Sequence, residues 1–120
     1  MSQSPIVIVK QLTSRLENAT ASERLDTLQE FQTLARTEAK LIGEYALQRV
    51  LDFLREQGSA DEYQELLDLI DRLIKTRDRS AAVANTAIIL SSIGNVELLL
   101  GMFPSFVTIC VIIFSWLSLH

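Results

Sequence analysis

The sequence is poor in the residues that most catalytic and metal sites require. It contains one histidine, His120, and one cysteine, Cys110, so it can build neither a histidine-based triad nor a cluster of His and Cys metal ligands. The four glycines are scattered, and none belongs to a Gly-rich phosphate-binding loop. The many carboxylates are expected on solvent-exposed helix faces, where nothing raises the pKa of a general acid. We therefore expect a protein that is not an enzyme and uses no cofactor.

A single cysteine also excludes an internal disulfide and is typical of proteins in a reducing compartment. The N-terminal apolar run, residues 6–9, is ended by Lys10 and is much shorter than the apolar core of a secretory signal. Both features predict a cytoplasmic location.

Positive charge is scarce as well. The chain has 11 Lys and Arg against 15 Asp and Glu, for a net charge of −4. Binding to nucleic acid or to an anionic membrane surface requires clustered positive charge, so neither is an expected partner. A small-molecule substrate is not expected either, because the sequence lacks the residues of a catalytic site. The densest basic stretch, residues 72–79, is expected to be a solvated helix face with acid–base pairs four residues apart, Asp68 with Arg72 and Asp71 with Lys75.

Only two prolines occur, and apolar residues at helical spacing fill most of the chain between them. We predict helices over residues 5–18, 20–35, 38–57, 59–76 and 81–93. The boundary signals are capping boxes at Thr20 with Glu23 and at Ser59 with Glu62, an N-cap at Ser80, and C-terminal glycines at Gly58 and Gly94.

The second and fourth of these helices carry the same pattern, 39 positions apart. The series Leu28, Phe31, Leu34, Ala35, Arg36 and Thr37 recurs as Leu67, Ile70, Leu73, Ile74, Lys75 and Thr76. A self-match at this offset is typical of stacked armadillo or HEAT repeats of roughly 40 residues. Such units bury their apolar faces against neighbours and present surfaces that bind proteins. We therefore predict an all-α, armadillo/HEAT-like helical-repeat fragment of about two repeats.

The third predicted helix has an apolar half and a polar half with no mixing between them. So wide an apolar arc is typical of a helix packed between two neighbours. Because the last helix of an armadillo unit usually lines the concave side, its polar side is a predicted protein-binding surface. We call this surface the polar stripe, and it consists of Glu44, Gln48, Asp52 and Arg55. The alternative is a polar face that is merely solvated.

Charge disappears from the sequence after Glu97, which predicts two regions, a helical head over residues 1–97 and an uncharged hydrophobic tail over residues 98–120. As a helix the tail would be about 34 Å long, enough for a hydrocarbon core of roughly 30 Å. However, Gly101 and Pro104 interrupt it, and the apolar stretch after Pro104 is short for a crossing. The residues of this candidate membrane segment are Phe106, Val107, Ile109, Val111, Ile112, Ile113, Phe114 and Trp116.

Three interpretations of the tail stay open. It is a membrane anchor, a buried terminal helix, or, for residues 101–120, sequence that is not native, such as a translated intron in a truncated gene. The abrupt loss of charge and of helical pattern favours the last of these.

Several segments carry a resemblance to a known family. They are Leu12, Arg15 and Leu16; Arg24, Leu28, Phe31 and Leu34; the block Ile-Gly-x-x-Ala-Leu-x-x-Val-Leu-x-Phe-Leu over 42–54; Asp61, Glu62, Leu67, Asp68, Ile70, Leu73 and Ile74; and Asn-Val-x-Leu-Leu-Leu over 95–100. Across residues 8–100 the chain resembles the start of the general vesicular transport factor family. These are Golgi vesicle-tethering proteins with an armadillo-like head.

The resemblance implies a protein-binding module in transport between endoplasmic reticulum and Golgi, located in the cytoplasm at the Golgi membrane periphery. It implies a Rab GTPase, golgins and SNAREs as partners, with peripheral membrane association. The chain departs from the family after Gly101 and has no heptad segment, so the family's coiled-coil dimerisation and acidic-tail binding are not carried over. The alternatives are a tail-anchored adaptor with an unrelated HEAT-like head, and a structural helical scaffold with no transport role.

Overall fold

In the computed structural model the chain is described at residues 4–56, 60–102, 108, 110–113 and 115. Every regular element within these residues is a helix, so the prediction of an all-α fold is confirmed. Whether the helices form true sequence repeats stays a prediction.

The first two helices begin where the sequence signals place them. Helix α1 (Pro5–Asn18) has its proline in the first turn, where a missing backbone N–H costs nothing. Helix α2 (Ala21–Ile42) follows the predicted capping box, in which the Glu23 carboxylate accepts a hydrogen bond of 3.2 Å from the backbone N–H of Thr20.

The predicted boundary near residue 38 is present as a kink rather than as a break. Glu38 has φ −123° and ψ 34°, yet helical hydrogen bonding continues through it to Ile42. A π-helical turn, η1 (Gly43–Leu47), comes next and leads directly into α3 (Gln48–Glu56). The predicted stop at Gly58 and N-cap at Ser59 lie outside the described residues.

Helix α4 (Ala60–Ile74) precedes α5 (Arg79–Leu90), whose N-cap was predicted wrongly. The cap is Asp78, whose Oδ1 accepts a hydrogen bond from the Ala81 N–H at 3.2 Å. Ser80 instead accepts a hydrogen bond from Lys40 Nζ at 2.9 Å. A carboxylate two positions earlier therefore takes the capping role.

The prediction that Gly94 ends the fifth helix is also wrong. Helix α5 ends at Leu90, and Gly94 lies in the first turn of a further helix, α6 (Ile93–Met102). The two helices are bent by 93° relative to each other. Ser92 Oγ accepts a hydrogen bond from the Asn95 N–H at 3.4 Å, so a serine N-cap starts the new helix at the position where the glycine had predicted an end.

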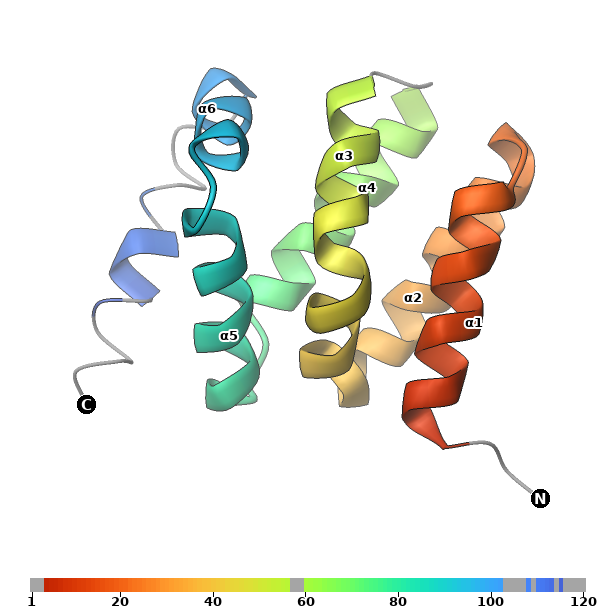
Figure 1. Ribbon diagram of the computed structural model, residues 1–120, viewed down its shortest axis with the longest axis horizontal. Helices are drawn as coiled ribbons and strands as arrows, with labels where there is room; N and C mark the ends of the chain where they lie inside the picture. Colours follow the sequence, from red (N-terminus) through yellow and green to blue (C-terminus); the bar gives the residue numbers. More distant parts are fainter. Residues whose placement is uncertain (1–3, 57–59, 103–107, 109, 114, 116–120) are drawn as a thin grey trace.

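The helices form two layers (Figure 1). In that view α1, η1 with α3, and α5 run side by side in a front layer, and α2 and α4 lie behind them in a rear layer. The main core lies between the layers and contains large, fully buried side chains that include Phe31, Leu47, Leu51 and Ile70. The matching apolar positions of α2 and α4 are buried in this core, except for Leu34, which is partly buried and packs against it, and the two helices pack against each other.

One buried amide joins three of these helices. Asn85 of α5 is fully buried, and its Nδ2 donates hydrogen bonds to the Ala39 carbonyl of α2 at 3.2 Å and to the Leu73 carbonyl of α4 at 2.8 Å. Gly43 packs directly on this amide, because a Cβ at position 43 would lie 1.6 Å from Asn85 Oδ1. The spacing between α2 and α4 is thus set by a side chain of the front layer.

Candidate protein-binding surfaces

The polar stripe lies along η1 and α3, and the structure brings three of its four residues together. Gln48 Nε2 donates to Asp52 Oδ1 at 3.1 Å, and Arg55 Nη1 lies 3.5 Å from the same oxygen. Glu44 stands apart, beside a shallow hollow that Lys40 of α2 and Ile88 of α5 also line. Glu44, Gln48 and Arg55 are exposed, and Asp52 is half-buried.

Neighbouring helices use much of the stripe's hydrogen-bonding capacity. Arg49, which the sequence had not singled out, bridges Asp52 at 3.4 Å and Glu17 of α1 at 2.9 Å. Gln48 exchanges two side-chain hydrogen bonds, of 3.1 and 2.9 Å, with the fully buried Asn95 of α6. The stripe therefore links α1, α3 and α6, and its binding role stays a prediction.

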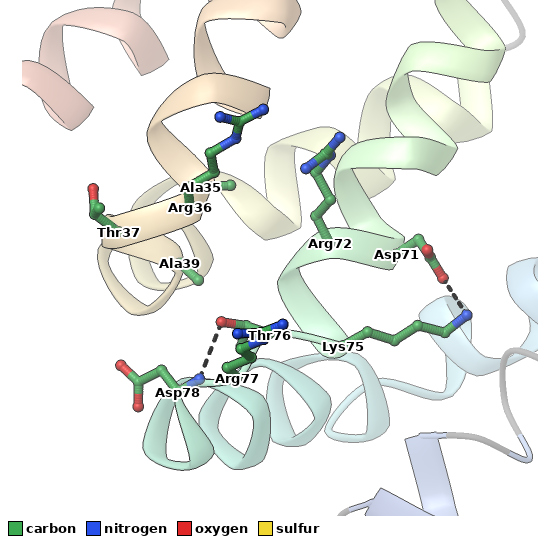
Figure 2. Close-up of a pocket in the computed structure, with 10 residues that line it drawn as sticks. All are labelled: Ala35, Arg36, Thr37, Ala39, Asp71, Arg72, Lys75, Thr76, Arg77 and Asp78. Carbon is green, nitrogen blue, oxygen red and sulfur yellow. Dashed lines mark hydrogen bonds and ion pairs between the residues drawn. The ribbon is translucent and has the colours of Figure 1, made fainter.

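A second surface lies in the rear layer and was not predicted. A hollow of about 560 Å³ opens between the ends of α2 and α4 and the connection to α5. Figure 2 shows Arg36 on α2, Arg72 on α4 and Arg77 on the connection around this hollow. We call the surface lined by these three residues the arginine groove.

One of the two acid–base pairs predicted near this groove forms and the other does not. Lys75 Nζ and Asp71 Oδ1 are 2.8 Å apart, as the spacing predicts. Within the described part of the chain no ion pair joins Asp68 to Arg72. Asp68 Oδ1 instead accepts a hydrogen bond from Gln64 Nε2 at 2.9 Å, one turn earlier on α4, and Arg72 has no acidic partner.

The arginines of the chain divide into two groups. Arg15, Arg24, Arg49 and Arg55 each lie in an ion pair with Asp or Glu. Among the residues that the structure describes, Arg36, Arg72, Arg77 and Arg79 form none, and the first three of these line the same groove. The spacing of residues along the sequence does not predict that these arginines lie together, because Arg36 is brought to Arg72 only by the packing of α2 on α4.

The expectation that all carboxylates lie on solvent faces is wrong for Glu62. Its side chain is nearly fully buried, and Oε1 lies 2.5 Å from Arg24 Nη1. The Arg24 guanidinium also stacks on the Phe53 ring, 4.5 Å from its centroid. The cation is held in place by α2 and α3, and its charge therefore offsets the desolvation cost of burying the Glu62 carboxylate.

The tail is described only in part. Val111 and Ile112 are exposed, and Ile113 is half-buried, whereas Phe106, Val107, Ile109, Phe114 and Trp116 lie outside the described residues. Cys110 is buried, and this burial raises the pKa of its thiol to about 11.

No single helix among the described residues has the length and apolar character needed to cross a membrane. By those two criteria one bent pair, Arg79–Leu90 with Ile93–Gly101, does pass. The described residues also contain no group of three or more His, Cys, Asp and Glu side chains placed to hold a metal ion.

Comparison with known proteins finds no family model, no curated protein and no solved structure that matches this chain.

Proposed function

We propose that this chain is a protein-binding helical module that acts in vesicle tethering between endoplasmic reticulum and Golgi. The observation that carries the protein-binding part is the packing of α2 and α4 side by side in one layer, with all of their matched apolar positions except Leu34 buried. This is the arrangement expected for neighbouring repeat units, whose outer faces bind other proteins. The assignment to vesicle tethering rests on the sequence resemblance over residues 8–100.

The partners that follow from the resemblance are a Rab GTPase, golgins and SNAREs, met in the cytoplasm at the Golgi membrane periphery. The polar stripe is the proposed contact surface for one of them. Glu44 and Arg55 are its exposed ends, and Asp52 holds Arg55 in place at 3.5 Å. Charges fixed in this way on rigid helices give orientation and specificity to an interface.

The test is capture of purified partners by the tagged full-length chain. A Rab GTPase of the early secretory route is presented with bound GTP analogue or with bound GDP, and a golgin and a SNARE are presented separately. We expect capture of the GTP-bound form in preference to the GDP-bound form. Absence of capture for all three partner classes would contradict the vesicle-tethering proposal and favour a structural scaffold.

The stripe is tested in the same assay by the charge reversals Asp52→Lys and Arg55→Glu made together. The matched control reverses the exposed pair Arg15–Glu30, whose atoms lie 2.6 Å apart on α1 and α2. We expect capture to fall only in the stripe variant, with circular dichroism unchanged in both. Unchanged capture by the stripe variant would remove the stripe from the proposal but leave the function in place.

A second candidate function, an adaptor anchored by its tail, is favoured by the exposure of Val111 and Ile112. An anchored chain would stay in the membrane pellet after an alkaline carbonate wash, because a spanning segment is held by burial. We expect the full-length chain to be released instead, since the apolar stretch after Pro104 is short for a crossing. Retention that Val111→Asp with Ile112→Asp abolishes would favour the anchor.

A further inference from the structure

The arginine groove gathers positive charge on a protein whose net charge is negative. Its three arginines come from α2, from α4 and from the connection to α5 (Figure 2), and all three side chains are exposed. No carboxylate lies within ion-pair distance of any of them in the described residues. Like charges placed around one hollow repel each other, and a bound anion would remove that repulsion.

The other charged residues of the groove are already engaged. Lys75 is paired with Asp71 at 2.8 Å, and Asp78 Oδ1 caps α5 through the Ala81 N–H at 3.2 Å. Among the positively charged side chains of this surface, the three guanidinium groups are therefore those without an ion pair in the described part of the chain. Each offers a planar fork of N–H donors that matches the two oxygens of a carboxylate.

The size of the groove also suits a short peptide segment. The small side chains of Ala35 and Ala39 are nearly fully buried and form part of its α2 wall. A volume of about 560 Å³ holds a segment of only a few residues. The width is set in advance, because Asn85 is hydrogen-bonded to carbonyls of both α2 and α4.

The carboxylates next to the groove disfavour the binding of a long polyanion. Next to the groove, along the same seam between α2 and α4, lies a second hollow that is lined by Glu65 and Asp68 and shares Asp71 and Arg72 with the groove. A nucleic-acid backbone or an anionic membrane surface that covered the arginines would also meet these carboxylates. A short acidic segment that stays within the groove does not meet Glu65 or Asp68, which lie outside its lining, and Asp71 is already paired with Lys75.

From these observations we propose that the arginine groove binds a short acidic peptide segment of a partner protein, with two or three carboxylates seated on Arg36, Arg72 and Arg77. This goes beyond the proposed function, because the groove is in the rear layer and the polar stripe is in the front layer. The two surfaces leave the chain able to hold two partners at once.

The test uses the full-length chain and two fluorescent peptides of equal length, one rich in Glu and Asp and the other with Gln and Asn in their place. Anisotropy titrations at low salt measure their dissociation constants. We expect the acidic peptide to bind and the neutral peptide to bind at least about tenfold more weakly, because the carboxylate pairs are lost. Equal binding of both peptides would overturn the proposal, as would the absence of binding.

The groove variant Arg36→Gln with Arg72→Gln is compared with a control variant, Arg15→Gln with Arg79→Gln, which removes the same charge outside the groove. We expect about a tenfold loss of affinity for the acidic peptide in the groove variant and less than about a twofold loss in the control. Equal losses in both would mean that net charge alone attracts the peptide, and the groove would not be the site.

Duplex RNA and vesicles rich in phosphatidylserine are titrated alongside the peptides. Tighter binding of either one than of the acidic peptide would overturn the proposal in favour of that ligand. Capture of the Rab GTPase by the groove variant is measured separately. Its persistence together with loss of peptide binding shows that the two surfaces work independently, and each proposal can therefore fail without the other.

Discussion

The polar stripe and the arginine groove are both charged surfaces, but their charges are satisfied differently. In the stripe, Asp52 lies between Arg49 and Arg55, and Gln48 is hydrogen-bonded to Asn95. In the groove, the three arginines have no acidic partner in the described residues. The comparison teaches that the pairing of charges matters as well as their number. Unpaired arginines can take the carboxylates of a ligand directly, whereas paired charges present a fixed orientation to a partner.

The difference arises from how each surface is assembled. The stripe's contacts with Asp52 join residues three or four positions apart on one helical segment, so favourable pairs come from local spacing. The groove combines two helices and a connection that are brought together by packing. Nothing in the local spacing of α4 supplies a partner for Arg72 once Asp68 is bonded to Gln64.

The largest effect is expected where a paired charge is buried. Glu62→Gln leaves the Arg24 guanidinium with no counter-charge in a mostly buried position, which costs about 3 kcal/mol of unfolding free energy. Urea denaturation followed by circular dichroism measures the loss. The control Glu30→Gln breaks the exposed pair with Arg15 and should cost less than about 0.5 kcal/mol. Equal losses of unfolding free energy in the two variants would show that burial does not strengthen the pair of Glu62 with Arg24.

A somewhat smaller loss is expected from Gly43→Ala, which acts on the hydrogen bonds by which Asn85 joins α2 and α4 beside the arginine groove. The added Cβ would lie 1.6 Å from Asn85 Oδ1, so the amide must move away from the Ala39 and Leu73 carbonyls. Overpacking of this kind costs about 2 kcal/mol. The control is Gly101→Ala, since nothing lies within 4 Å of its Cβ position, and it should leave the melting temperature unchanged or slightly higher. A stable Gly43→Ala protein would show that the junction is not rigid.

Asn95→Ala tests the attachment of the stripe to α6. It removes two hydrogen bonds with Gln48 from a buried site and should cost about 1 kcal/mol in the same denaturation assay. Gln64→Ala is the matched control, because its bond to Asp68 is exposed and contributes little. A loss in the control as large as in Asn95→Ala would contradict the linking role of the stripe.

The smallest changes in stability are expected from Asp52→Asn and Arg72→Gln, which each remove one charge from one of the two surfaces. Asp52→Asn removes the counter-charge of Arg55 and one of the two counter-charges of Arg49, and it should lower stability by less than about 0.5 kcal/mol. Arg72→Gln removes a charge that has no partner, so stability should stay the same or rise slightly. Melting temperatures at low and high salt provide the measurement. A clear loss of stability in Arg72→Gln would show that this arginine has a structural partner after all.

Local sequence signals predicted much of the helical framework. Pro5, the Thr20 capping box and the segregated faces of α3 and α4 act through interactions within a turn or two of helix, so they can be read without knowledge of the fold. The same kind of reading failed at Gly94, because Ser92 supplies a competing N-cap and the chain bends there into α6. Of the candidate stripe, the sequence placed Gln48 correctly on a polar face but could not reveal its partner Asn95, 47 positions later.

The sequence by itself therefore determined the all-α class, the apolar faces of the helices and the matching pattern of α2 and α4, because helical periodicity is a local property of the chain. Only the tertiary structure decided which charged side chains are paired. Burial of Glu62 depends on Arg24, 38 positions away, and the gathering of Arg36 with Arg72 and Arg77 depends on the packing of α2 on α4. Electrostatic pairing acts between groups a few ångströms apart in space, and that distance is set by the fold rather than by the spacing along the chain.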